Sequence, residues 1–74
     1  MKRIIVVAMP ERKGVYLLTV AEGAHAQAGF GSVPESHTAQ DLPGALVKLG
    51  VIQEIANRAA IEVDKNGQWI SDVG

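Results

Sequence analysis

An unbroken apolar run near the N-terminus constrains this chain more than any other feature. Residues 3–9 (RIIVVAM) are rich in Ile and Val and lack the apolar–polar alternation of a half-exposed strand. Such a run is typical of a strand that is covered on both faces or lies centrally in a small sheet. A charged turn over residues 10–14 follows, and residues 15–21 then indicate the return strand of a hairpin.

Residues 24–31 show the opposite pattern, a strict alternation between two sides. Ala24, Ala26, Ala28 and Phe30 fall on one side, and His25, Gln27, Gly29 and Gly31 fall on the other. This period of two predicts a third, half-exposed strand. Because its residues are small, we expect that strand to be short or to lie at an edge of the sheet.

A helix is predicted from Asp41 to about Arg58. Asp41 can cap its start, and Pro43 is acceptable in the first turn. Gly50 leaves two alternatives, one helix that carries a glycine or two short helices with Gly50 as the stop. One apolar arc continues in phase across Gly50, which favours the single helix. The arc consists of Leu42, Ala45, Leu46, Leu49, Ile52, Ala56 and Ala59.

The end of the chain has the clearest local signal. Residues 61–64 and 69–73 flank an Asn66-Gly67 pair, which favours a tight type I′ turn and therefore a second hairpin. The whole chain, residues 1–74, then forms one α+β domain. Its elements follow the order strand, strand, strand, helix, strand, strand, with the helix packed on one face of a small antiparallel sheet.

Composition excludes several classes of function. Seven Lys and Arg oppose eight Asp and Glu, so the formal charge of -1 supplies no global field to hold nucleic acid. The absence of cysteine excludes a disulfide framework and thiolate metal sites, and it suits a reducing cytosol. No stretch approaches the ~20 apolar residues that cross a bilayer, so we expect no membrane partner.

Catalytic and metal sites are not indicated. Ser32, Ser36, His37 and Asp41 contain the groups of a nucleophile, a base and an orienter, but they lie in or beside one short loop. We interpret them as turn and capping groups. A structural zinc site needs four ligands, and His25 with His37 do not supply them. We therefore expect no catalytic residues, no metal, no cofactor and no enzymatic activity.

Trp69 is the first candidate for a binding surface. In the predicted hairpin it shares a face with Glu62 and Asp64, and Asp72 lies nearby on the same strand. A large aromatic side chain rimmed by carboxylates suits contact with a basic protein surface. The alternative is that Trp69 is buried, either because the turn slips by one residue or because the helix covers that face.

A second apolar line on the predicted helix is the other candidate. Val47, Val51 and Ile55 are spaced i, i+4, i+8, roughly opposite the core arc, and would contact a partner or a second copy of the chain. The alternative is that Gly50 breaks the helix and turns Val51 and Ile55 inward.

The first half of the chain resembles HicB-type antitoxins in the order of its elements. The strand opening at residues 1–4, the turn with Gly14, the strand with Tyr16 and the helix start at residues 41–42 carry this resemblance over about residues 1–50. It implies a partial RNase H-like fold and a partner that neutralises a toxin. The DNA-binding tail of that family is absent, and the helix start departs from its usual acidic pattern.

The ending of the chain, residues 65–70 (KNGQWI), is similar to hairpin endings among phage-encoded anti-CRISPR proteins. This resemblance implies a cytoplasmic, stoichiometric inhibitor that occupies a surface of a bacterial immune nucleoprotein complex without binding nucleic acid directly. We therefore expect a non-enzymatic protein-binding module. The alternatives are an antitoxin-like partner and a small oligomeric ligand-binding or enzyme subunit. The expected contact residues are Trp69, Glu62, Asp64, Asp72, Val47, Val51 and Ile55.

Overall fold

The computed structural model describes residues 2–22 and 34–73, which form an antiparallel sheet with two helices. The strands follow the order β3-β2-β1-β4 across the sheet. The α+β class predicted from the sequence is therefore confirmed. The elements are β1 (Lys2–Ala8), β2 (Val15–Glu22), β3 (Glu35–Thr38), α2 (Leu42–Lys48), α3 (Gln53–Asn66) and β4 (Gln68–Val73).

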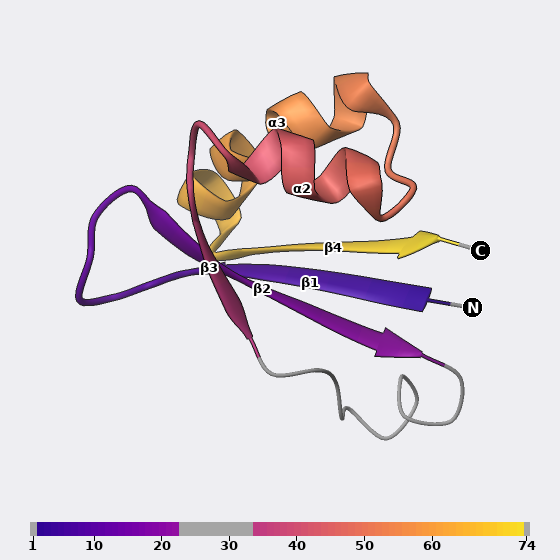
Figure 1. Cartoon of the computed structure of the whole chain (residues 1–74). Helices are drawn as coiled ribbons and strands as arrows, with labels where there is room; N and C mark the ends of the chain where they lie inside the picture. The colour runs from indigo at the N-terminus through magenta and orange to yellow at the C-terminus, as the bar shows by residue number, and fades with distance from the viewer. Residues whose placement is uncertain (1, 23–33, 74) are drawn as a thin grey trace.

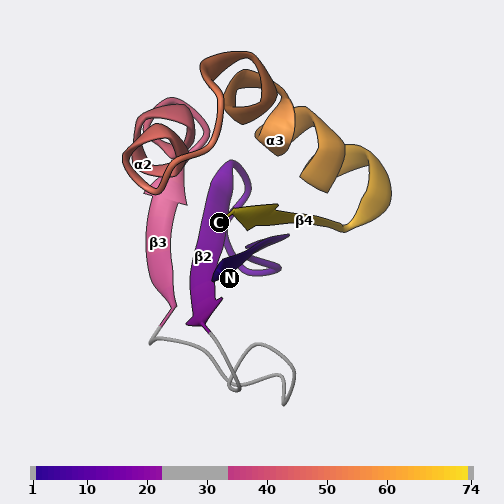
Figure 2. The same cartoon turned by 90° about the vertical axis from the view of Figure 1, so that its right-hand side faces the viewer.

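Both helices lie on the same side of the sheet, as Figures 1 and 2 show from two directions. We call the side that faces the helices the inner face and the other side the outer face. The hydrophobic core fills the space between the inner face and the helices. Its buried members are Ile4, Val6, Tyr16, Leu18, Leu42, Leu46, Val51, Ala56, Ala59 and Val63.

Strand β1 lies centrally, between β2 and β4, as its unbroken apolar run predicts. Because side chains alternate along a strand, Ile4 and Val6 point into the core and are 0% exposed. Ile5 and Val7 point to the outer face, where they are partly exposed. The run is therefore apolar on both faces, while the helices cover only one.

Gly50 separates the helices, so the single continuous helix favoured by the sequence is wrong and the two-helix alternative is correct. Gly50 has φ +102°, and its N–H donates to the Val47 carbonyl while the Val51 N–H donates to the Leu46 carbonyl. These two bonds form a Schellman motif, which ends a helix with a left-handed residue. Val51 then turns into the core, where it is 6% exposed.

The hairpin predicted at the end of the chain is also wrong, because residues 61–64 belong to α3. Ala56, Ala59 and Val63 recur at helical spacing and are buried. Gly67 ends the helix with φ +88°, and its N–H donates to the Val63 carbonyl at 2.7 Å. A type I′ turn and a helix C-terminus both require a positive φ, so an Asn-Gly pair serves either structure.

Three further predictions concern a strand, the core arc and a helix cap. The strand expected over residues 24–31 lies outside the described residues, and the strand that pairs with β2 is β3. Ile52, assigned to the core arc, is 67% exposed because it lies in the linker at the start of α3. Asp41 precedes α2, but its carboxylate accepts a hydrogen bond from Thr38 Oγ1 (3.1 Å) and caps no helical N–H.

Candidate functional site

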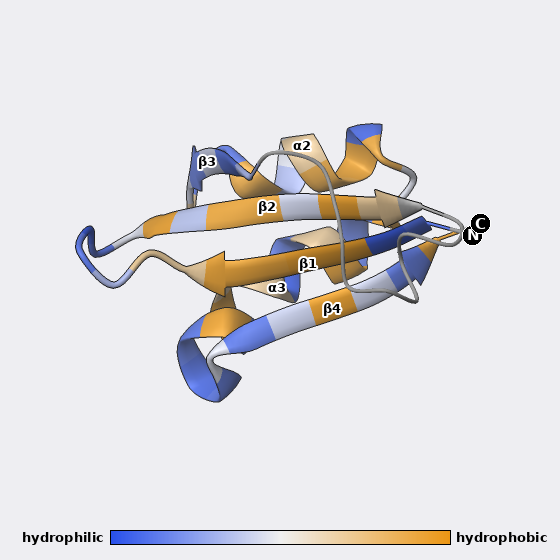
Figure 3. Ribbon diagram, turned by 90° about the horizontal axis from the view of Figure 1, so that it is seen from below, coloured by the Kyte–Doolittle hydropathy of each residue, from blue (hydrophilic) through white to orange (hydrophobic). Residues whose placement is uncertain are grey.

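The outer face of the sheet presents an apolar patch formed by Ile5, Val7, Leu17 and Ile70. The strand register places Ile5 opposite Ile70 and Val7 opposite Leu17, so these side chains are contiguous across three strands. Ile70 is 47% exposed, and the other three are partly exposed. Figure 3 looks onto this face, with both helices behind the sheet. Among the described elements, none covers the patch.

One end of this outer patch is bordered by an ion pair. Arg3 and Asp72 are opposite each other in the β1–β4 register, and Arg3 Nε donates to Asp72 Oδ1 at 2.9 Å. The hydrogen bond from Arg3, and then its charge, hold the pKa of the Asp72 carboxyl below its ordinary value. Arg3 and Asp72 are therefore both charged at neutral pH, and each is the other's partner within the chain.

The size of the outer face is suited to a protein contact. Strands are ~4.8 Å apart and rise ~3.3 Å per residue, so four strands of this length cover roughly 400 Å². Apolar patches of a few hundred Å² on a monomer are often functional. The outer patch lies across three neighbouring strands of one sheet face, so its geometry favours contact with another surface over enclosure of a small molecule.

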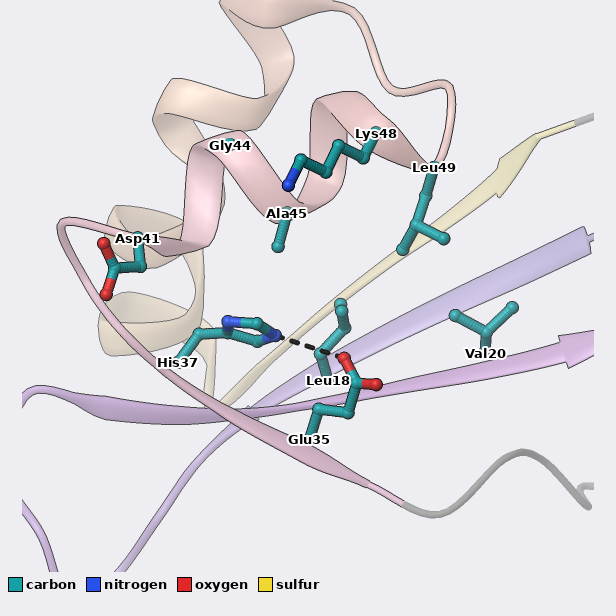
Figure 4. Close-up of a pocket in the computed structure, with 9 residues that line it drawn as sticks. All are labelled: Leu18, Val20, Glu35, His37, Asp41, Gly44, Ala45, Lys48 and Leu49. Carbon is teal, nitrogen blue, oxygen red and sulfur yellow. Dashed lines mark ion pairs between the residues drawn. The ribbon is translucent and has the colours of Figure 1, made fainter.

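A pocket of about 650 Å³ lies on the opposite side of the sheet, between α2 and the β2–β3 edge (Figure 4). It opens there because α2 presents the small residues Gly44 and Ala45. A methyl group added at Gly44 would meet nothing within 4 Å. The lining residues are Leu18, Val20, Glu35, His37, Asp41, Gly44, Ala45, Lys48 and Leu49.

His37 is one of the residues that line this pocket. Its Nε2 atom is shielded from solvent, accepts or donates no hydrogen bond and lies 3.4 Å from Glu35 Oε2. A shielded nitrogen cannot exchange a proton with a molecule in the pocket unless the ring moves. The described residues that line the pocket include no hydroxyl or thiol to act as a nucleophile.

The residues weighed as a catalytic group do not come together. Ser36 and His37 are consecutive in β3, so their side chains point to opposite faces of the sheet. Ser32 and His25 lie outside the described residues. Within residues 2–22 and 34–73, no three His, Asp or Glu side chains are placed to hold a metal ion. No helix of this part of the chain is long and apolar enough to cross a membrane.

The structure does not gather Trp69, Glu62, Asp64 and Asp72 on one surface, because the predicted hairpin that grouped them is absent. Trp69 points to the inner face and packs against the core, whereas Asp72 points to the outer face. Asp64 accepts a hydrogen bond from the Tyr16 hydroxyl at 2.8 Å, and Glu62 accepts one from Asn66. The alternative in which a helix covers Trp69 is the one that the structure supports.

The apolar line of Val47, Val51 and Ile55 is also broken. Its three residues belong to α2, the linker and α3, respectively, because the helix ends at Gly50. Val51 is buried, while Val47 and Ile55 are 38% and 45% exposed. The inward turn expected after a break at Gly50 is therefore correct for Val51 and wrong for Ile55.

The outer patch was missed at the level of sequence, although its signal was present. Residues 3–9 are apolar on both faces, a pattern that implies cover on both faces. One helix layer can cover only one of them. The run does not show which face stays open, and that Leu17 in β2 and Ile70 in β4 join the patch follows from the strand register.

No protein-family model, no curated protein and no solved structure matches this chain.

Proposed function

We propose that this chain is a non-enzymatic protein-binding module whose contact surface is the outer face of the sheet. The observation that carries the proposal is the apolar patch of Ile5, Val7, Leu17 and Ile70, which the described helices leave open. The partner is a folded protein with an apolar surface of its own, because a flat aliphatic patch gains free energy only by being removed from water.

The energetics of β1 support this assignment. Ile4 and Val6 are already fully buried, so a partner could remove no further surface of these two side chains from water. Full burial of an aliphatic side chain is worth about 1.5–3 kcal/mol, and the outer patch retains a part of that free energy for association. The strands are fixed by pairing within the sheet, so binding orders little additional backbone.

The most specific version of the proposal is a stoichiometric inhibitor that occupies a surface of a bacterial immune complex. A preformed face that binds without chemistry is compatible with this role. Residues 65–70, whose resemblance to anti-CRISPR hairpin endings suggested the role, form the end of α3 and the start of β4, so the proposal rests on the outer face and not on that resemblance. We propose that the chain acts in the cytosol, since a chain without cysteine suits a reducing environment.

Affinity capture with two matched variants tests the proposal. Leu17→Lys places a charge in the outer patch, and Ile61→Lys places the same charge on α3, where Ile61 is 65% exposed. Each variant and the wild type are immobilised and exposed to lysate, after circular dichroism has verified the fold. We expect a retained protein that Leu17→Lys loses and Ile61→Lys keeps.

Retention by both variants, or by neither, would show that the outer patch is not the contact surface. The identity of the retained protein then refines the role. A nucleoprotein complex of bacterial immunity supports the inhibitor version, whereas a toxin supports the antitoxin alternative. The retained protein should rebind when purified, with an affinity that Leu17→Lys lowers by roughly tenfold or more.

A further inference from the structure

The two edges of the sheet differ in how they are protected against pairing with another strand. Edge strand β3 has four residues, follows Pro34 and carries Glu35. Short length, proline and charge are the usual means by which proteins block an edge. Edge strand β4 has six residues, QWISDV, and lacks proline. Its one charged residue, Asp72, is paired with Arg3 of the same chain. Among the described elements, only β1 pairs with β4.

The backbone groups that β4 leaves free can be identified from the hydrogen-bond pattern. Met9 N–H donates to the Val15 carbonyl at 3.0 Å, so the odd-numbered residues of β1 exchange their bonds with β2. In an antiparallel sheet successive residues alternate in direction, so the even-numbered residues of β1 bond to β4. In the β1–β4 register these residues face Trp69, Ser71 and Val73. The N–H and C=O groups of Gln68, Ile70 and Asp72 therefore point away from the sheet.

We propose that two copies of this chain pair through β4, antiparallel, about a two-fold axis at Ile70. This register places Ile70 opposite Ile70 of the second copy and Gln68 opposite its Asp72. All three residues with outward backbone groups then face one another, and each opposed pair exchanges two hydrogen bonds. A two-fold axis makes the contact self-complementary, as in most homodimers.

The side chains favour the same register. The Gln68 amide can donate to the carboxylate of Asp72 in the second copy, and the two Ile70 side chains meet as an apolar pair. A shift of two residues in one direction opposes Ile70 to Asp72 and places Gln68 opposite residue 74, outside the described residues, so the contact between Gln68 and Asp72 is lost. A shift in the other direction leaves Asp72 opposite the end of α3. Of these three registers, the pairing centred on Ile70 is the one that opposes the described outward-facing residues, Gln68, Ile70 and Asp72, to one another.

The paired molecule has a consequence for the outer face. Two sheets joined through β4 form one sheet of eight strands, with the two outer patches side by side. The two outer faces together, polar residues included, have a footprint of roughly 800 Å², about the area that each partner contributes to a standard protein interface. The dimer rests on the pairing of two short strands and the few side chains between them, so we expect it to depend on concentration. It uses the β4 edge and does not require the outer patch to bind a partner.

Sedimentation equilibrium across a micromolar to millimolar series tests the dimer. Ile70→Pro removes an N–H that points away from the sheet, so the ladder with β1 should survive while the second copy loses its central bonds. We expect a wild-type dimer whose dissociation constant rises by roughly tenfold or more in Ile70→Pro. Leu17→Lys, on the outer face and away from the edge, should dimerise like the wild type. A monomeric wild type, or a dimer that folded Ile70→Pro leaves unchanged, would overturn the proposal.

Single-cysteine variants test the register without relying on Ile70→Pro to fold. The chain has no native cysteine, so any disulfide joins the introduced residues. Opposed residues in a hydrogen-bonded pair have Cα atoms ~5.5 Å apart, within the range that a disulfide spans. Under mild oxidation we expect Ile70→Cys to form a covalent dimer much faster than Ile61→Cys on α3. Equal rates would contradict the pairing.

A mixture of two variants separates this register from its neighbours. Gln68→Cys and Asp72→Cys, combined in equal amounts, should cross-link to each other in preference to themselves, because the proposed pairing opposes these two positions. A shift of two residues opposes Ile70 to Asp72 or to Gln68, so the mixture would then show no preferential linkage between Gln68→Cys and Asp72→Cys, and that result would overturn the pairing centred on Ile70. These outcomes are independent of the capture experiment, so a failed dimer and a failed outer patch can be told apart.

Discussion

The two faces of β1 carry nearly the same chemistry in different surroundings. Ile4 and Val6 point toward the helices and are fully buried, whereas Ile5 and Val7 point to the outer face and keep part of their surface in water. One short strand therefore holds a structural face and an open face, one residue apart. Residue type alone therefore does not show whether a side chain contributes to stability or to binding. The position of the helix layer decides which aliphatic side chains are already buried.

The largest expected effect separates these two faces directly. Ile4→Ala should lower the free energy of unfolding by about 2–5 kcal/mol, because it leaves a cavity in the core. Ile5→Ala removes the same atoms from a partly exposed site and should cost about 1 kcal/mol or less. Urea denaturation of both variants measures the difference. Equal losses would mean that the outer face is as tightly packed as the inner one.

The two glycines that end the helices give the next largest effect. Gly50→Ala forces a left-handed residue and brings a methyl group to 3.0 Å from Val73 Cγ1 on the inner face. Gly67→Ala forces the same conformation, but its methyl group meets nothing within 4 Å. We expect a loss of about 1–2 kcal/mol for Gly67→Ala and a larger loss for Gly50→Ala. Thermal denaturation ranks the two, and the reverse order would contradict the packing of the linker on β4.

A hydrogen bond under the helix layer gives a pH-dependent effect. The Tyr16 hydroxyl donates to Asp64, and this bond, with burial and the negative charge, raises the pKa of Tyr16 above its ordinary value. The fold therefore favours the neutral phenol. The resulting stability is present below the unfolded pKa of about 10 and is lost as pH rises through the folded pKa.

Tyr16 is the only tyrosine, so alkaline titration of tyrosinate absorbance reports on it alone. We expect a midpoint above that of free tyrosine, which Asp64→Ala moves downward. An ordinary midpoint in the wild type would contradict the bond. Tyr16→Phe removes the hydroxyl and should cost about 1 kcal/mol of stability.

The smallest effect on stability is expected for the ion pair between Arg3 and Asp72 at the border of the outer face. Arg3 lowers the pKa of the Asp72 carboxyl, so this pair contributes stability above the ordinary carboxyl pKa, and the contribution is lost as pH falls through the lowered value. Because both side chains are well exposed, Arg3→Gln should change stability little. Carboxyl resonances followed by NMR should show the Asp72 pKa rising in Arg3→Gln. No change would mean that the two side chains are apart in solution.

Sequence patterns predicted the features that depend on local periodicity. The run at residues 3–9 gave a central strand, and the spacing of Leu42 and Leu46 gave a buried helical face. Gly50 was identified as a candidate stop. The choice between one helix and two required the Schellman bonds to the Leu46 and Val47 carbonyls, which no periodicity reveals.

The errors arose where one local signal fits two structures. Asn66-Gly67 supplies the positive φ of a tight turn and equally of a helix C-terminus, and the helical spacing of Ala56, Ala59 and Val63 decides between them. The Trp69 surface depended on that hairpin and was lost with it. The outer patch depends on which face the helices cover, and that is a tertiary property that a single strand does not encode.

Cross-saturation NMR on the complex with a captured and purified partner maps the contact surface of this chain residue by residue. Protons of the partner are saturated, and the methyl groups of this chain that lie against it lose intensity. We expect losses at Ile5, Val7, Leu17 and Ile70 on the outer face, with the buried methyl groups of Leu42 and Leu46 unaffected. Losses at Val47, Ile52, Ile55 and Ile61 instead would place the contact on the helix layer and would contradict binding through the outer face.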